Sequence, residues 1–111
     1  MCSNTDQIKN DKAHGACAAA FEVFGDHWTL VIVDALRSAE LRFKALQTKL
    51  SIHSATLTTK LKRLEELKLV NRKKETVNKL SVSYALSDLG KEVLPVLDAM
   101  HQFGEKILRT V

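Results

Sequence analysis

The feature that most constrains the fold is one strictly alternating segment in a chain whose other apolar residues recur at helical spacing. From Leu80 to Leu86, large apolar residues alternate with Ser and Ala, which is the period-two pattern of a half-buried strand. Residues 69–77 predict a second strand, and Asn78 and Lys79 fit the turn between the two. Because an isolated hairpin is marginally stable in water, this hairpin must pack its apolar face against helices.

Apolar residues at intervals of three and four predict the helices around this hairpin. We expect a short strand at Leu41–Phe43. Asp26, Ser54 and Ser87 are suited to cap helix N-termini, and Pro95 should kink or divide the last helix near residues 91–94. The predicted helices are Ala16–Phe24, His27–Arg37, Lys44–Leu50, Ser54–Leu67 and a long C-terminal helix that follows Ser87.

The length of 111 residues and a hydrophobic content of 45% are suited to one compact domain. We expect this domain to span residues 15–111, after a flexible arm at residues 1–14. Its fold class is mainly α with a small β-hairpin (α+β). No signal peptide is visible, and no apolar run reaches the roughly 18 to 20 residues of a membrane span. We therefore expect a cytoplasmic protein that does not bind membranes.

Basic residues are concentrated in the middle of the chain. The segment Arg42–Lys79 contains 11 basic and 3 acidic residues, a net charge of +8, whereas the rest of the chain has a net charge of −4. Phosphates attract such a patch whatever the nucleotide sequence, so the distribution indicates nucleic-acid binding. The alternative is a solvated basic face without a partner.

The order of the predicted elements is that of a winged helix-turn-helix, in which one helix enters the major groove of DNA. Leucines at positions 57, 61 and 64 line one side of the fourth predicted helix, so its small polar and basic residues can face a partner. In this recognition helix we expect DNA contacts from Ser54, Ala55, Thr56, Thr59, Lys60, Lys62 and Arg63. Contacts to the DNA backbone and from the hairpin, or wing, are expected from Arg42, Lys44, Arg72, Lys73, Lys74 and Lys79.

The last predicted helix carries an apolar stripe that is too broad for one small domain to cover. Its residues follow alternating steps of three and four, which predicts a partner helix from a second subunit. The alternative is packing against the first two helices of the same chain. The seam consists of Leu89, Val93, Val96, Met100, Phe103 and Ile107.

The residues that could support catalysis or metal binding form no pattern. His14, His27, His53 and His101 are scattered, without a metal-type spacing or a glycine-rich phosphate loop. We therefore expect neither catalytic residues, metal nor cofactor, and no enzyme activity. In a cytoplasmic protein the two cysteines, at positions 2 and 17, are expected to be free thiols.

Several motifs resemble those of the HxlR-type branch of the MarR-like winged-helix regulators, over residues 17–107. Cys17 followed by the segment at 25–29 is similar to the family's cysteine and Gly-Gly-Lys-Trp-Thr motif. The departures are an alanine at position 18 in place of proline, Asp26-His27 in place of Gly-Lys, Lys68 where glycine is usual, and a wing without prolines. Further matches are Arg42-Phe43-Lys44-Ala45-Leu46, the recognition segment Leu57–Glu65, Tyr84–Gly90 and Leu94-Pro95-Val96-Leu97.

The resemblance implies a bacterial repressor or activator that binds double-stranded operator DNA as a homodimer. The first and last helices would form the dimer interface, which adds Cys17 and Phe21 to the seam. In some members an N-terminal cysteine is reactive, so Cys17 is a candidate redox sensor if its position in the first helical turn favours the thiolate; the alternative is a small buried residue in the interface. The alternative function is a winged-helix module that binds protein or RNA, and the sequence identifies no small-molecule effector.

Overall fold

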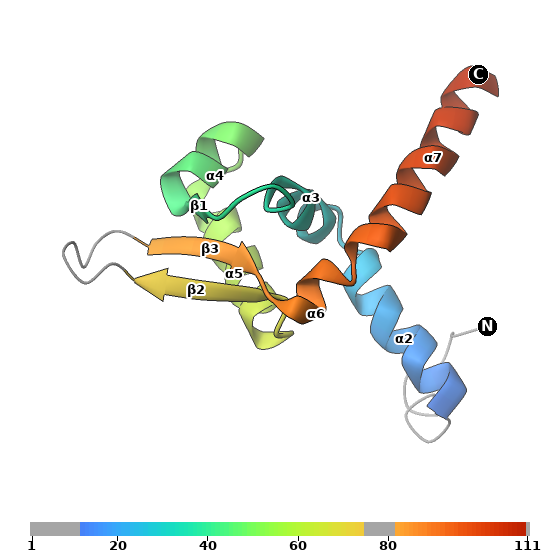
Figure 1. The fold of residues 1–111 in the computed structure, drawn as a ribbon, viewed down its shortest axis with the longest axis horizontal. Helices are drawn as coiled ribbons and strands as arrows, with labels where there is room; N and C mark the ends of the chain where they lie inside the picture. The colour runs from blue at the N-terminus through green and yellow to red at the C-terminus, as the bar shows by residue number, and fades with distance from the viewer. Residues whose placement is uncertain (1–11, 75–81, 111) are drawn as a thin grey trace.

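The computed structural model describes residues 12–74 and 82–110 and contains the predicted winged helix-turn-helix arrangement (Figure 1). Four of the helices precede the wing, and the last predicted helix is divided in two. The elements are α2 (Lys12–Phe24), α3 (His27–Ala35), β1 (Leu41–Arg42), α4 (Phe43–Leu50), α5 (Ser54–Glu66), β2 (Val70–Lys74), β3 (Val82–Leu86), α6 (Asp88–Lys91) and α7 (Leu94–Thr110).

The sheet has three antiparallel strands in the order β1-β3-β2, so β3 is the central strand. The predicted hairpin is confirmed in its two strands, whereas its turn at residues 78–79 lies outside the described residues. Strict alternation would leave Ser83 exposed, but this side chain is 7% exposed. The reason is that β1 pairs with β3 at Arg42 and Ser83, and the Ser83 hydroxyl donates a hydrogen bond to Glu40.

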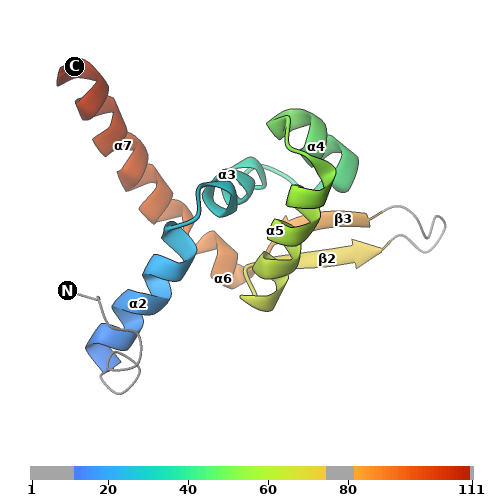
Figure 2. The ribbon, with the colours of Figure 1, turned by 180° about the vertical axis from the view of Figure 1, so that it is seen from behind.

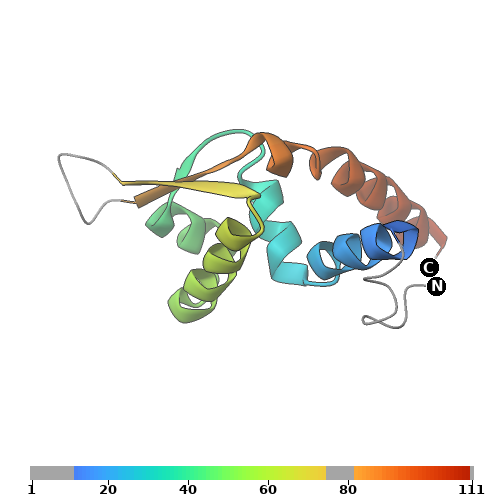
Figure 3. The same cartoon turned by 90° about the horizontal axis from the view of Figure 1, so that it is seen from below.

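The hydrophobic core lies where α3, α4 and α5 pack against one another and against the sheet. Figures 2 and 3 show α5 covering one face of the β2–β3 ribbon. The side chains at the centre of the core are fully buried, as expected for the apolar stripes of these helices. They include Ile32, Leu46, Leu57, Leu61 and Leu64.

Two of the three predicted N-caps are confirmed. Asp26 accepts a hydrogen bond from the backbone N–H of Trp28 at 3.1 Å, and Ser87 accepts one from Gly90 at 3.0 Å. The third is wrong, because α5 includes Ser54 and His53 is its cap. A serine before a leucine stripe is a strong sequence signal for a cap, but the chain is already helical at this position.

One departure from the family pattern, Lys68, lies at the C-terminal end of α5. Lys68, where the family has glycine, adopts a left-handed conformation with φ of 64°. The backbone N–H of Leu69 donates to the Leu64 carbonyl and that of Lys68 to the Glu65 carbonyl, both at 3.0 Å, which is the Schellman pattern at a helix C-terminus. The turn therefore keeps the geometry that favours glycine, although a lysine occupies it.

The first and last helices extend away from the core on the side opposite the wing (Figures 1 and 3). Pro95 lies in the first turn of α7, a position where a missing N–H costs no helical hydrogen bond, and residues 92–93 separate α7 from α6. The predicted division is therefore confirmed. At the other end, α2 begins at Lys12, four residues before the predicted start.

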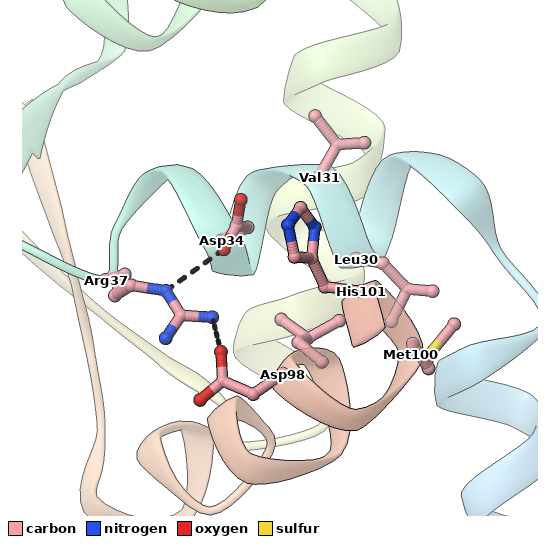
Figure 4. Close-up of a pocket in the computed structure, with 8 residues that line it drawn as sticks. Leu30, Val31, Asp34, Arg37, Asp98, Met100 and His101 are labelled. Carbon is pink, nitrogen blue, oxygen red and sulfur yellow. Dashed lines mark hydrogen bonds and ion pairs between the residues drawn. The ribbon is translucent and has the colours of Figure 1, made fainter. Parts of the chain in front are cut away.

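Arg37 joins α3 to the first turns of α7 (Figure 4). Its guanidinium donates to Asp34 at 3.1 Å and contacts Asp98 at 2.8 Å. These two carboxylates, Asp98 first, raise the pKa of Arg37 above its ordinary value. The Arg37–Asp98 pair borders an open cavity of about 480 Å³ between α3 and α7.

Residues 12–74 and 82–110 contain neither a single membrane-spanning helix nor a cluster of metal-binding side chains. No single helix in these ranges is long and apolar enough to span a membrane, although Gly15–Phe24 and His27–Ala35, bent by 74°, together pass that test. In the same ranges, no group of three or more His, Cys, Asp or Glu side chains could hold a metal ion.

Candidate nucleic-acid interface

The outward face of α5 is the centre of the candidate interface. The leucine stripe of α5 is buried, so the opposite side of the helix is exposed to solvent at Ala55, Thr59 and Lys62. The helix α5 lies at the bottom of the view in Figure 3, and α6 lies at the top. Of the predicted recognition residues, Ser54, Ala55, Thr59, Lys62 and Arg63 are exposed, whereas Thr56 and Lys60 are half-buried.

Thr58 is an exposed residue of the same face that the sequence analysis did not include. The signal that could have identified it is the spacing of Ala55, Thr58, Thr59 and Lys62, which is i, i+3, i+4 and i+7. The hydroxyl of Thr58 donates to the Ser54 carbonyl at 2.8 Å, and that of Thr59 donates to the Ala55 carbonyl at 3.0 Å. With their protons so engaged, both threonines offer a partner a methyl group and an acceptor oxygen.

Lys60 is half-buried and contacts Asp26, so its predicted DNA contact stays a prediction. Its ammonium lies 2.7 Å from the Asp26 carboxylate, and both side chains are about 30% exposed. The pKa of Asp26 is lowered, and the hydrogen bond from Lys60 is the largest cause. Burial acts in the opposite direction, and the hydrogen bonds from Thr29 and the Trp28 backbone lower the pKa further. Lys60 thus fixes α5 to the cap of α3.

Arg63 lies at the edge of the outward face, one turn beyond Lys60. Its guanidinium donates to Glu22 on α2 at 3.4 Å, and the two side chains are 47% and 58% exposed. An exposed pair of this kind contributes about 0 to 1 kcal/mol to stability. The pair therefore leaves Arg63 able to reach another anion.

The wing residues are exposed but divide between the two faces of the sheet. Antiparallel register places Arg72 opposite Tyr84 and Lys73 opposite Ser83, and paired residues share a face. Lys73 consequently borders a polar pocket of about 270 Å³ together with Glu40, Arg42 and Ser83. Arg72 and Lys74 lie on the other face of the sheet, the one that α5 covers.

Two more predicted contacts flank the start of α4. Arg42 precedes this helix and Lys44 lies in its first turn, and both are exposed. A helix N-terminus together with basic side chains favours phosphate oxygens. The last predicted wing residue, Lys79, lies outside the described residues.

Six of the eight predicted dimer residues are exposed, whereas Cys17 is half-buried and Val93 is buried. The exposed fractions of Phe21, Leu89 and Phe103 are 57%, 49% and 66%, and those of Val96, Met100 and Ile107 lie between 42% and 46%. Val93 is 8% exposed and belongs to the hydrophobic core. Its assignment to the interface is corrected, because the turn between α6 and α7 directs it inward.

Cys17 differs from the prediction in both its chemistry and its position. Its sulfur is disulfide-bonded, so the prediction of a free thiol, which rested on the expected compartment rather than on geometry, is wrong. Since α2 begins at Lys12, Cys17 is beyond the first helical turn, and the helix dipole offers no support for a thiolate there. The other cysteine, Cys2, lies outside the described residues.

Comparison with known proteins identifies the family of this chain. Residues 23–111 match the family model described as HxlR-like helix-turn-helix. An uncharacterized HTH-type transcriptional regulator of Methanothermobacter thermautotrophicus is 29% identical over 101 residues, which cover 90% of this chain and 77% of that protein. Another, from Halalkalibacterium halodurans, is 34% identical over 86 residues, 76% of each chain.

Solved structures agree with the family match. A MarR-family regulator of Porphyromonas gingivalis is 27% identical with a TM-score of 0.73, over 80% of this chain and 88% of that one. The reduced form of the regulator YodB from B. subtilis is 25% identical with a TM-score of 0.72, over the same shares of the two chains. The chain belongs to the HxlR-like helix-turn-helix family and has the winged helix-turn-helix fold of its transcriptional regulators.

Proposed function

We propose that this chain regulates transcription by inserting α5 into the major groove of an operator. The observation that carries the proposal is the division of α5 into a buried leucine stripe and an exposed face of small polar and basic residues. Small side chains let the helix backbone approach the bases. An α-helix of this width fits the major groove of B-DNA.

The exposed side chains support different kinds of DNA contact. Thr58 and Thr59 can touch a thymine methyl or accept from a base amino group, and Lys62 and Arg63 can donate to guanine. Arg42 and Lys44 at the start of α4, with Arg72 and Lys74 on the wing, are placed to contact phosphates, which position the protein without reading sequence.

Lys62→Ala is expected to weaken binding to operator DNA about tenfold, because it removes a donor from the centre of the outward face. The measurement is a fluorescence anisotropy titration of a labelled duplex from the region upstream of the chain's own gene. Lys91→Ala is the matched control, since it removes the same charge from α6 on the far side of the domain.

The same titration separates this function from the alternatives. Wild-type protein should bind the upstream duplex more tightly than a shuffled duplex of the same composition. Equal affinity for both duplexes and for double-stranded RNA of the same sequence would contradict operator recognition and favour an RNA-binding module.

We also propose that the regulator acts as a homodimer through α2 and α7. None of the residues Leu94–Thr110 is buried, although one side of α7 presents Met100, Phe103 and Ile107. An apolar groove of about 350 Å³ between α2 and the α6–α7 turn continues this surface. A second copy of α7 has the apolar stripe that would cover it.

Finally, we propose that the redox state of Cys17 tunes operator affinity. The residue lies on α2, within the proposed interface, and its disulfide can be reduced to thiols by a dithiol. A cross-link on α2 would alter the packing of the interface and with it the spacing of the two recognition helices, which half-sites about 34–36 Å apart tolerate poorly. The similar YodB structure is a reduced form of that regulator.

Reduction by dithiothreitol is expected to strengthen operator binding by wild-type protein at least about fivefold, the lower end of ordinary allosteric coupling. Anisotropy titrations of the oxidised and reduced protein give the two affinities, and mass spectrometry verifies the state of Cys17. Cys17→Ser should show no response to the reductant. Identical affinities for verified oxidised and reduced wild type would contradict the sensor and leave Cys17 a structural residue.

A further inference from the structure

Two ion pairs connect the recognition helix to the corner between α2 and α3. Lys60 on α5 contacts Asp26, the N-cap of α3, and one turn later Arg63 contacts Glu22 in the last turn of α2. The paired residues lie 34 and 41 positions apart in the chain. Together the two contacts link α5, which would read DNA, to α2, which we propose to form part of the dimer interface, and to the cap of α3 that follows it.

The two pairs differ in how firmly they are built. Asp26 also accepts from the Trp28 backbone and from the Thr29 hydroxyl, each at 3.1 Å, so Lys60 completes a partly buried cluster. Glu22 contacts Arg63 at 3.4 Å, and both side chains are about half exposed. Because such an exposed pair is weak, the Arg63–Glu22 contact can exchange while the Lys60–Asp26 contact holds α5 in place.

Arg63 lies where such an exchange would affect DNA binding. It follows Lys62 directly and Thr59 by one turn, at the edge of the outward face of α5. A guanidinium there can donate to a phosphate or, in a bidentate way, to a guanine. A guanidinium that turns fully toward DNA gives up its contact with the Glu22 carboxylate.

We propose that Glu22 is an internal counterion of Arg63, which competes with DNA for this guanidinium and so lowers the affinity of the free regulator for its operator. The inference rests on the proposed DNA binding and adds a regulatory contact to it. A change in α2 that moves Glu22 alters the availability of Arg63, so the contact couples the proposed dimer helix to the recognition helix.

Removing the carboxylate tests the competition. Glu22→Gln is expected to raise operator affinity about threefold, since the loss of an exposed pair is worth up to about fivefold. A missing negative charge near DNA would raise affinity even without Arg63, so the measurement is repeated in the Arg63→Ala background. If Glu22 acts through Arg63, the gain disappears there.

A second measurement needs no DNA. In the free protein, nuclear magnetic resonance relaxation of the Arg63 Nε–Hε group should show greater mobility in Glu22→Gln than in wild type. Lys62→Gln serves as the comparison, because it removes an exposed charge next to Arg63 and changes neither partner of the Glu22–Arg63 contact. Thermal unfolding of each variant verifies that it is folded.

The possible outcomes separate this inference from the function on which it rests. Wild-type protein that binds no duplex would overturn both. Operator binding by wild type, with equal gains from Glu22→Gln in the two backgrounds or with unchanged mobility of Arg63, would overturn the counterion alone. A gain that requires Arg63, together with its increased mobility, supports it.

Discussion

Phe103→Asp is expected to raise the dissociation constant of the homodimer at least about 100-fold, the effect of removing an aromatic anchor from the centre of an interface. Phe103 is 66% exposed in the protomer and lies on the apolar side of α7, one turn from Met100 and Ile107. A carboxylate there would lose its hydration on association without gaining a partner. Sedimentation equilibrium over a range of protein concentrations measures the change.

Gln102→Asp is the matched control for this substitution. It introduces the same charge one residue away, on the polar side of α7, and should leave the dimer intact. A wild-type chain that is monomeric at micromolar concentration would contradict the dimer proposal, and a Phe103→Asp variant as dimeric as wild type would show that α7 does not carry the interface.

Gly90→Ala is expected to lower the free energy of unfolding by about 3 kcal/mol, at the upper end of the cost of overpacking. An added Cβ would lie 2.0 Å from the carbonyl oxygen of Leu69 and 3.4 Å from the Leu86 side chain. The same oxygen accepts a hydrogen bond from the Ser87 backbone at 3.0 Å. Relief of the clash must therefore move α6 away from the start of β2 and weaken the cap that Ser87 provides.

Gly104→Ala is the control for the glycine exchange itself. The added Cβ at position 104 has no neighbour within 4 Å, so alanine should stabilise α7 by about 0.5 to 1 kcal/mol. Chemical denaturation of both variants in the Phe103→Asp background removes the proposed dimer from the comparison. A Gly90→Ala protein as stable as its parent would contradict the close approach of α6 to Leu69.

Local pattern predicted the order and type of the elements because their signals lie within a few neighbouring residues. The leucine stripe predicted the bounds of α5 to within one residue, and the alternation of apolar and small residues predicted the strand β3. Pro95 divided the last helix, as its missing N–H requires. Helix ends were less accurate: α2 starts earlier than its apolar periodicity, and α5 is capped by His53 rather than Ser54.

The candidate site was predicted in outline but not in its contacts. A helical projection gives the side of α5 that faces away from the leucines, and Ala55, Thr59 and Lys62 are exposed as expected. It does not give the neighbours at the edge of that face. Lys60 and Arg63 looked equally available in the sequence, yet each has an acidic partner that lies 34 or 41 residues earlier in the chain.

The sequence by itself determined which segments fold, which faces they bury and where the positive charge gathers, because periodicity, caps and charge runs act over single turns and strands. Only the tertiary structure decided that Val93 joins the core, that Ser83 is covered by β1, and that Lys60 is held by Asp26. These outcomes depend on the angles at which elements pack, and those angles follow from side chains that meet across long separations in the chain.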